Sequence, residues 1–128
     1  MSDVESHFPD GAAYERLMGR WSQLAGQAFL DWVGPDPGQR WLDVGCGNGA
    51  FSEVIARHAR PSALTGIDPA SAQVDYARNR LPEPHATFHV GDALALPFDD
   101  ESFDVAVMAL VIAFVPDPAR AVSELARV

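Results

Sequence analysis

The sequence predicts an α/β fold, a doubly wound Rossmann-like sheet that is mostly parallel and carries helices on both faces. Two observations predict it: short apolar runs alternate with segments of helical periodicity, and each strand–helix unit takes roughly 30 residues, the length of a βαβ unit. Parallel neighbours joined by right-handed crossovers form an open sheet covered by helices. The length of 128 residues is that of one domain, so we expect a single domain over residues 1–128.

The first 38 residues are predicted to form a helical segment that precedes a Rossmann-like core at residues 39–128. Apolar side chains recur at helical spacing over residues 14–33, and Gly34-Pro35 ends the pattern. Glycine weakens a helix, so we expect two helical pieces with a break near Gly19-Arg20. The large aromatic side chains of the second piece are expected in the core; they are Trp21, Phe29 and Trp32.

Strands and helices are predicted to alternate in the core. Short apolar runs predict strands at residues 40–44 and 63–67, the first of them buried, and two further strands are expected at residues 86–90 and, rich in Val and Met, 103–113. Helical patterns follow three of them, at residues 50–59, 71–81 and 119–128, with Ser71 as the expected N-cap of the second helix. The last of these helices extends to the end of the sequence.

Charge and composition argue against several classes of function. The formal net charge is −9 and the nine basic residues are scattered, so neither nucleic-acid binding nor a polybasic membrane contact is expected. The longest apolar run, residues 105–115, is about half of the roughly 20 residues that span a bilayer. The single cysteine, Cys46, excludes an intrachain disulfide, and the four histidines lack metal-ligand spacing, so no metal is expected. We expect a cytoplasmic protein.

A glycine-rich turn joins the first predicted strand to the helix after it. Gly45, Gly47 and Gly49 occupy alternate positions, where the lack of a Cβ atom permits a sharp turn and close approach of a ligand. A tight turn without a ligand is the alternative. The spacing differs from the G-x-G-x-x-G fingerprint of dinucleotide-binding domains, because Ala50 stands at the position of the third glycine. An NAD-binding domain is therefore disfavoured.

Acidic residues end the second and third predicted strands, where ligands of open α/β sheets bind. Asp68 follows the glycines by about 20 residues, the place of a carboxylate that accepts both hydroxyl groups of a ribose. A helix cap or a solvated loop carboxylate is the alternative for Asp68. Asp92 can accept a hydrogen bond from an adenine amino group, although Gly-Asp is also a common turn pair.

Several segments together resemble class I S-adenosylmethionine-dependent methyltransferases, in the small-molecule branch near the ubiquinone and menaquinone biosynthesis enzymes. Asp43-Val44-Gly45-Cys46-Gly47-Asn48-Gly49 is similar to the first motif of that family. The other similar segments are Tyr14 to Ser22 (the leading helix), Gly66 to Ala70 (the second motif), Gly91-Asp92-Ala93 (the third), and Phe103 through Asp117 (the fourth strand and its exit loop).

The resemblance implies that the cofactor is S-adenosyl-L-methionine and indicates which residues bind it. They are Tyr14, Arg20, Asp43, Gly45, Cys46, Gly47, Asn48, Gly49, Asp68, Pro69, Asp92, Ala93 and Ala109. Asp43 suits the ammonium group of the cofactor's amino-acid tail, or alternatively pins the glycine loop by accepting its amide hydrogens. Tyr14 and Arg20 would lie over that tail, with Arg20 facing its carboxylate.

The resemblance also implies methyl transfer to a small-molecule acceptor. In-line displacement at a sulfonium depends on positioning and exclusion of water and requires no particular side chain, so no catalytic residue is assigned. The acceptor pocket is expected around Ala109, Leu110, Ile112, Ala113 and Phe114.

One departure from the family concerns length. The family's sheet usually has three further strands after the fourth, and we expect that this C-terminal part is missing from the 128 residues. An open sheet edge would then associate with another chain, for example as a homodimer. A non-catalytic module that binds the cofactor or a partner protein is thus the alternative function.

Overall fold

Four parallel strands form one sheet in the computed structural model, which describes residues 20–109 and 112–128. The strands are β1 (Arg40–Val44), β2 (Ala63–Asp68), β3 (Ala86–Val90) and β4 (Val105–Val107), in the order β3-β2-β1-β4. The chain moves outward from β1 to β3 and then returns across β1 to β4. This reversal confirms the predicted doubly wound topology.

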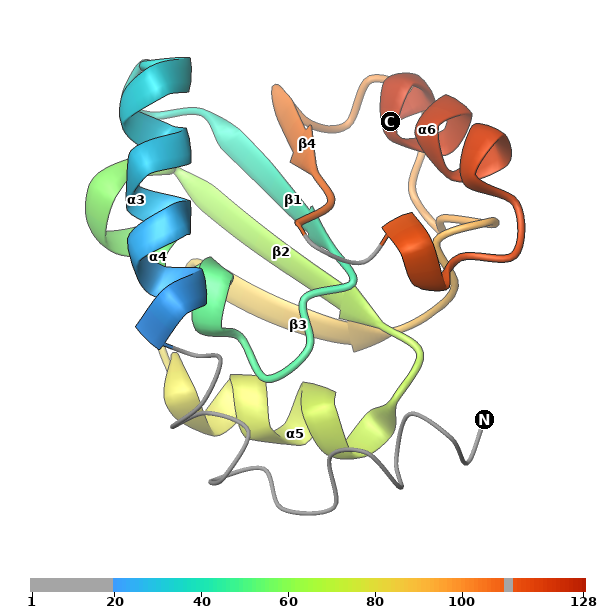
Figure 1. Cartoon of the computed structure of the whole chain (residues 1–128), viewed down its shortest axis with the longest axis horizontal. Coiled ribbons are helices and arrows are strands. Elements are labelled where there is room, and N and C mark those ends of the chain that lie inside the picture. Colours follow the sequence, from blue (N-terminus) through green and yellow to red (C-terminus); the bar gives the residue numbers. More distant parts are fainter. Residues whose placement is uncertain (1–19, 110–111) are drawn as a thin grey trace.

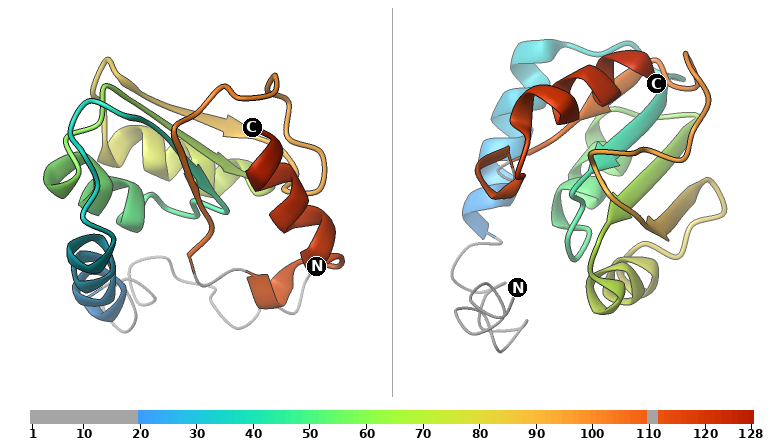
Figure 2. Two further views of the ribbon diagram at one scale, coloured as in Figure 1. Left: turned by 90° about the horizontal axis from the view of Figure 1, so that it is seen from above. Right: turned by 90° about the vertical axis from the view of Figure 1, so that its right-hand side faces the viewer.

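Helices cover both faces of the sheet, as predicted (Figures 1 and 2). On one face lie α3 (Arg20–Val33), α4 (Ala50–His58) and α5 (Ser71–Arg80), and on the other lies α6 (Pro118–Arg127). None of the helices in the described part of the chain is long and apolar enough to cross a membrane.

Side chains of β1 alternate between two apolar cores, as the period of a strand requires. Trp41 faces α3, α4 and α5, in a core completed by residues such as Ile55 and Val74. Leu42 and Val44 face the opposite core, in which Leu96 and Val128 are buried. The strand is therefore covered on both sides, in agreement with the burial of its residues 41–44.

Helix α3, Arg20–Val33, corresponds to the second predicted helical piece, and the first piece lies outside the described residues. Gly26 lies within α3, where a Cβ atom would come within 2.8 Å of the Phe51 ring, and one prediction for this helix is wrong. Its aromatic side chains are not in the core: Trp21 is 74% exposed, Trp32 82% and Phe29 42%. The core contact of α3 is instead made by Leu30 and by the close approach of Gly26 to α4.

The fourth strand is much shorter than the predicted residues 103–113. It pairs with residues 41–43 of β1 and ends at Val107, because β1 itself gives way to the glycine loop after Val44. A short 3₁₀ helix, η2 (Ile112–Phe114), follows where strand was expected.

The helix starts follow local hydrogen bonds. Ser71 was expected to cap α5, but Ala70 is the N-cap residue and no side chain caps this helix; Asp68 Oδ1 instead accepts the Ala70 amide at 2.9 Å. Helix α6 begins one residue earlier than predicted, with Asp117 Oδ1 accepting the Arg120 amide at 3.1 Å. An aspartate cap of this kind is the pattern that short polar side chains favour.

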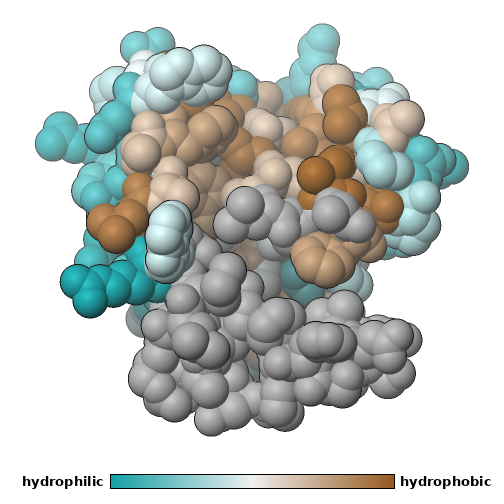
Figure 3. All heavy atoms as spheres, in the orientation of Figure 1, coloured by the Kyte–Doolittle hydropathy of each residue, from teal (hydrophilic) through white to brown (hydrophobic). Residues whose placement is uncertain are grey.

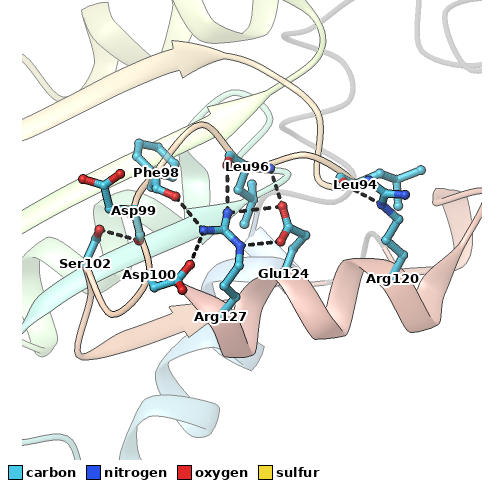
Figure 4. A network of polar contacts seen from close by, with 9 residues as sticks. All are labelled: Leu94, Leu96, Phe98, Asp99, Asp100, Ser102, Arg120, Glu124 and Arg127. Atoms are coloured by element: carbon cyan, nitrogen blue, oxygen red, sulfur yellow. Dashed lines mark hydrogen bonds and ion pairs between the residues drawn. The ribbon is translucent and has the colours of Figure 1, made fainter.

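Helix α6 is held against the loop of residues 94–102 by a polar network (Figure 4). The Arg127 guanidinium donates to the carbonyl groups of Leu96 and Phe98 at 2.9 and 2.8 Å, and to the carboxylate of Glu124 at 2.6 Å. Asp100 accepts a further bond at 2.8 Å. The loop and the helix are thus tied together beside the sheet.

Candidate functional site

The candidate site lies at the carboxyl ends of the four strands. The strand order reverses between β1 and β4, and in open α/β sheets ligands bind at the carboxyl ends of the strands beside such a reversal. The loops that follow β1, β2 and β3 meet at this edge through hydrogen bonds. These loops carry the residues that the sequence singled out.

The glycine loop is a left-handed turn that only glycine forms at low cost. The φ angles of Gly45, Gly47 and Gly49 are 71°, 54° and 85°. Gly49 also packs tightly, since a Cβ atom there would lie 3.0 Å from the Ala77 Cβ atom, whereas the Cβ position of Gly47 meets no atom within 4 Å. The loop is therefore pressed against α5 at Gly49 and open on the side of Gly47.

Hydrogen bonds connect the glycine loop to the end of β2. The amides of Gly45 and Cys46 both donate to the carbonyl of Ile67, at 2.8 and 3.0 Å. Asp68 is half-buried and accepts the Gly47 amide at 3.0 Å through Oδ2. Its Oδ1 atom accepts the Ala70 amide, so Asp68 fixes the loop after β1 to the loop after β2.

Asp92 lies next to Asp68 through the backbone, because the Gly91 amide donates to the Asp68 carbonyl at 3.1 Å. The Asp92 side chain is exposed and accepts the Leu94 amide at 2.9 Å, which forms a local turn. Pro69 is exposed and Ala93 half-buried. The acidic ends of β2 and β3 are thus adjacent, as the sequence predicted from their places in the strands.

Asp43 is only 1% exposed and lies beneath the glycine loop. Its Oδ2 atom accepts the hydroxyl of Ser52, which is itself fully buried, at 2.7 Å. Burial raises the pKa of Asp43 to about 7, with the Ser52 hydrogen bond opposing this and the Asp68 charge adding to it. The alternative role of Asp43, accepting amide hydrogens of the glycine loop, does not apply to the Gly47 amide, which donates to Asp68.

Two of the remaining predicted residues, Ala109 and Arg20, lie within the described part of the chain. Ala109 is half-buried and comes two residues after β4, at the same edge of the sheet. Arg20 is the exposed first residue of α3. Tyr14 and Leu110 lie outside the described residues. The expected acceptor region includes Phe114, which is 68% exposed, and Ile112, which is 40% exposed.

Ser52 is the residue that the sequence analysis missed. It occupies the first turn of α4 between the apolar residues Phe51 and Val54, and a buried hydroxyl there requires a partner. Asn48 contributes locally, since its Oδ1 atom accepts the Ala50 amide at 3.1 Å. Burial raises the pKa of the Cys46 thiol, so this cysteine is held in its neutral form.

Within residues 20–109 and 112–128, no group of three or more His, Cys, Asp or Glu side chains could hold a metal ion. The donors and acceptors at the strand ends are instead backbone amides and separate carboxylates. Such an arrangement suits a nucleoside with hydroxyl and amino groups.

Comparisons with known proteins point to one family. A family model described as a methyltransferase domain matches residues 42–128. A 2-phytyl-1,4-naphtoquinone methyltransferase of Trichormus variabilis is 32% identical over 113 residues, covering 84% of this chain and 48% of the relative. A demethylmenaquinone methyltransferase of Renibacterium salmoninarum is 37% identical over 114 residues, covering 85% of this chain and 43% of the relative. The chain spans less than half the length of these two relatives.

Solved structures agree with this result. A SAM-dependent methyltransferase of Thermotoga maritima superposes with a TM-score of 0.73 at 28% identity, covering 99% of this chain and 56% of that one. A methyltransferase solved in complex with the Haloferax volcanii Trm112 activator gives a TM-score of 0.81 at 24% identity, covering 98% and 54%. The second likeness shows the fold alone.

Proposed function

Because this chain belongs to the methyltransferase domain family, we propose that the carboxyl edge of its sheet binds the methyl donor and supports methyl transfer to a small molecule. S-adenosyl-L-methionine is the cofactor of this class of domain. One observation carries the proposed placement: hydrogen bonds join the glycine loop, Asp68 and the turn at Asp92 at the carboxyl ends of β1, β2 and β3.

The proposed roles follow from these contacts. The Asp68 carboxylate keeps acceptor capacity beyond its bonds to Gly47 and Ala70, and that capacity suits the two hydroxyl groups of a ribose. Asp92 is exposed beside it and suits an adenine amino group. The open side of Gly47 leaves room for the cofactor's tail above Asp43. Cys46, Asn48, Pro69, Ala93 and Ala109 complete the proposed binding set, together with Tyr14 and Arg20.

The bound cofactor supplies an electrophilic methyl group on a sulfonium. The chain's own contribution is to hold the donor along the strand ends and to exclude water from the path of the acceptor. Residues after β4 are the proposed acceptor side, because Ala109 is half-buried at the edge while Phe114 is exposed. No side chain is assigned as a base.

The acceptor class is proposed from the relatives. Both curated relatives named above methylate quinone-type compounds by their names, so reduced naphthoquinones and benzoquinones form the first panel of acceptors. The 128-residue chain is incubated with the cofactor and each acceptor, and S-adenosylhomocysteine formation is measured. S-adenosylhomocysteine that forms only when an acceptor is present supports the proposal. Cofactor binding without S-adenosylhomocysteine formation on any acceptor favours a non-catalytic binding module.

A second function, protein association, is favoured by the outer edge of β4. This strand ends the sheet order and has no strand partner on its outer side among the described residues. The other edge differs, because the Arg78 guanidinium covers the Phe88 carbonyl of β3 with bonds of 3.2 and 2.8 Å. Figure 3 shows apolar residues gathered on the face of the molecule that is turned to the viewer in Figure 1. β4 is visible from this side.

We infer that a second copy of the chain pairs along the outer edge of β4. An isologous pairing of two β4 edges would leave neither strand open. Sedimentation velocity over a concentration series tests this. A dimer that Val107→Pro converts to a folded monomer supports the pairing, and a monomer at all concentrations contradicts it. Cytoplasmic location stays a prediction.

A further inference from the structure

The Asp43–Ser52 contact has a feature that the proposed nucleoside site does not require. Both residues are essentially inaccessible, and their side chains meet at 2.7 Å beneath the glycine loop. No cationic side chain within residues 20–109 and 112–128 pairs with Asp43. A buried carboxylate that has one hydroxyl donor and no cation is costly to keep ionised.

We propose that Ser52 is a positioning residue for the cofactor site, and that the Asp43–Ser52 pair releases one proton when the ammonium group of a ligand binds above the glycine loop. This inference rests on the proposed function, because the ligand is a nucleoside that carries an ammonium group. The O–H bond of the neutral Asp43 carboxyl breaks, its proton passes to the solvent, and the carboxylate that remains faces the new positive charge.

The surroundings of Asp43 disfavour its charge before a ligand arrives. From β2, the Asp68 carboxylate adds repulsion, and in the loop the Cys46 thiol is held neutral by burial. The paired segment of β4, Val105–Val107, contains no titratable side chain. Within residues 20–109 and 112–128, the Ser52 hydroxyl opposes these effects, because a hydrogen bond to the charged form stabilises that form.

Several charged residues of the neighbouring elements pair with one another. On α4, the Glu53 carboxylate pairs with Arg57 at 3.5 Å and with Arg80 of α5 at 3.4 Å. At the opposite end of β1, Arg40 pairs with Asp104 at 3.2 Å. A cationic ligand at the loop would therefore be the charge complement of Asp43.

The direction of the pH dependence follows from the buried carboxyl. The pKa of Asp43 is raised to about 7, so the free protein is mostly protonated there at pH 6 and mostly ionised at pH 8.5. A bound cation favours the ionised form and lowers this pKa. Binding is then weakened at low pH by the need to remove the proton, by about tenfold at pH 6 relative to pH 8.5.

Calorimetric titration with S-adenosylhomocysteine tests the proposal in buffers of different ionisation enthalpy. We expect the release of most of one proton at pH 6 and almost none at pH 8.5. Asp43→Asn removes the carboxyl group but leaves the histidines and the titrating groups of the ligand unchanged. This variant is expected to release no proton when S-adenosylhomocysteine binds. Ser52→Ala removes the opposing hydrogen bond, so its proton release and its loss of affinity extend to higher pH.

Ser71→Ala is the matched control, because Ser71 is an exposed serine in the first turn of α5. The affinity and the proton release of this variant are expected to depend on pH as those of the wild-type chain do. Wild-type binding without proton release at pH 6 overturns this inference and leaves the proposed function standing. A Ser52→Ala profile that coincides with the wild-type profile overturns the role of Ser52. No binding at any pH by the folded wild-type chain overturns both proposals.

Discussion

Gly49→Ala tests whether the glycine loop is pressed against α5 as the structure shows. The substitution has two costs. At φ 85° an alanine lies in the left-handed region, which costs about 1–2 kcal/mol. Its Cβ atom would also lie 3.0 Å from Ala77 Cβ and 3.2 Å from Ala77 Cα, and overpacking of this kind costs about 1–3 kcal/mol.

Gly38→Ala isolates the second cost. Gly38 has nearly the same φ angle, 82°, but a Cβ atom there meets nothing within 4 Å. Effects of alanine on the unfolded chain are common to both variants and cancel in the comparison. We therefore expect the free energy of unfolding of Gly49→Ala to lie about 1–3 kcal/mol below that of Gly38→Ala.

Urea denaturation followed by circular dichroism measures this difference. With an m value of about 1.5 kcal/mol/M, the midpoints of the two variants should differ by roughly 0.7–2 M. Equal midpoints would refute the close approach of Gly49 to α5. They would also remove the argument that this glycine sets the position of the loop.

Three further predictions concern the site and its supports. Asp68→Ala should weaken S-adenosylhomocysteine binding at least tenfold, about 1.4 kcal/mol, since two ribose hydroxyls lose a charged acceptor; unchanged calorimetric affinity in a folded variant would remove Asp68 from the site. Arg127→Ala should lower the urea midpoint because α6 loses its bonds to the Leu96 and Phe98 carbonyls, and a wild-type midpoint would contradict the role of this network. Arg127 also lowers the pKa of Glu124 through a hydrogen bond, so the pair stabilises the fold above the ordinary glutamate pKa. This stabilisation is lost as the pH falls through the lowered pKa of Glu124. Urea denaturation at decreasing pH should therefore show a smaller loss of stability for Arg127→Ala than for the wild-type chain.

The strands β1, β2 and β3 could be predicted from the sequence because local information determines them. Each is a short segment bounded by turn residues, and the acidic or glycine residues that follow are visible without the fold. The adjacency of Asp68 and Asp92 also follows, because parallel strands end at one edge.

The errors arose where a partner decides the outcome. The end of β4 depends on the length of β1, which no pattern within residues 103–113 reveals. The apolar spacing of α3 shows which side chains share a face, but not whether another segment covers that face, and Trp21 and Trp32 are exposed. The start of α5 likewise depends on a residue of another element. Asp68, at the end of β2, accepts the amide of the N-cap residue Ala70, and Ser71 does not cap the helix.

Ser52 was missed for the same physical reason. Its partner, Asp43, lies nine residues away on another element, and the pairing becomes visible only when α4 packs on β1. The buried position of a hydroxyl on an apolar helix face was the available signal.

Calorimetric titration of the 128-residue chain with S-adenosylhomocysteine, with NADH as the control ligand, tests the central claim most directly. The account predicts micromolar binding of S-adenosylhomocysteine and none of NADH, because the loop lacks the third glycine of a dinucleotide fingerprint. A cooperatively folded chain that binds neither ligand, or that binds NADH in preference, would contradict it.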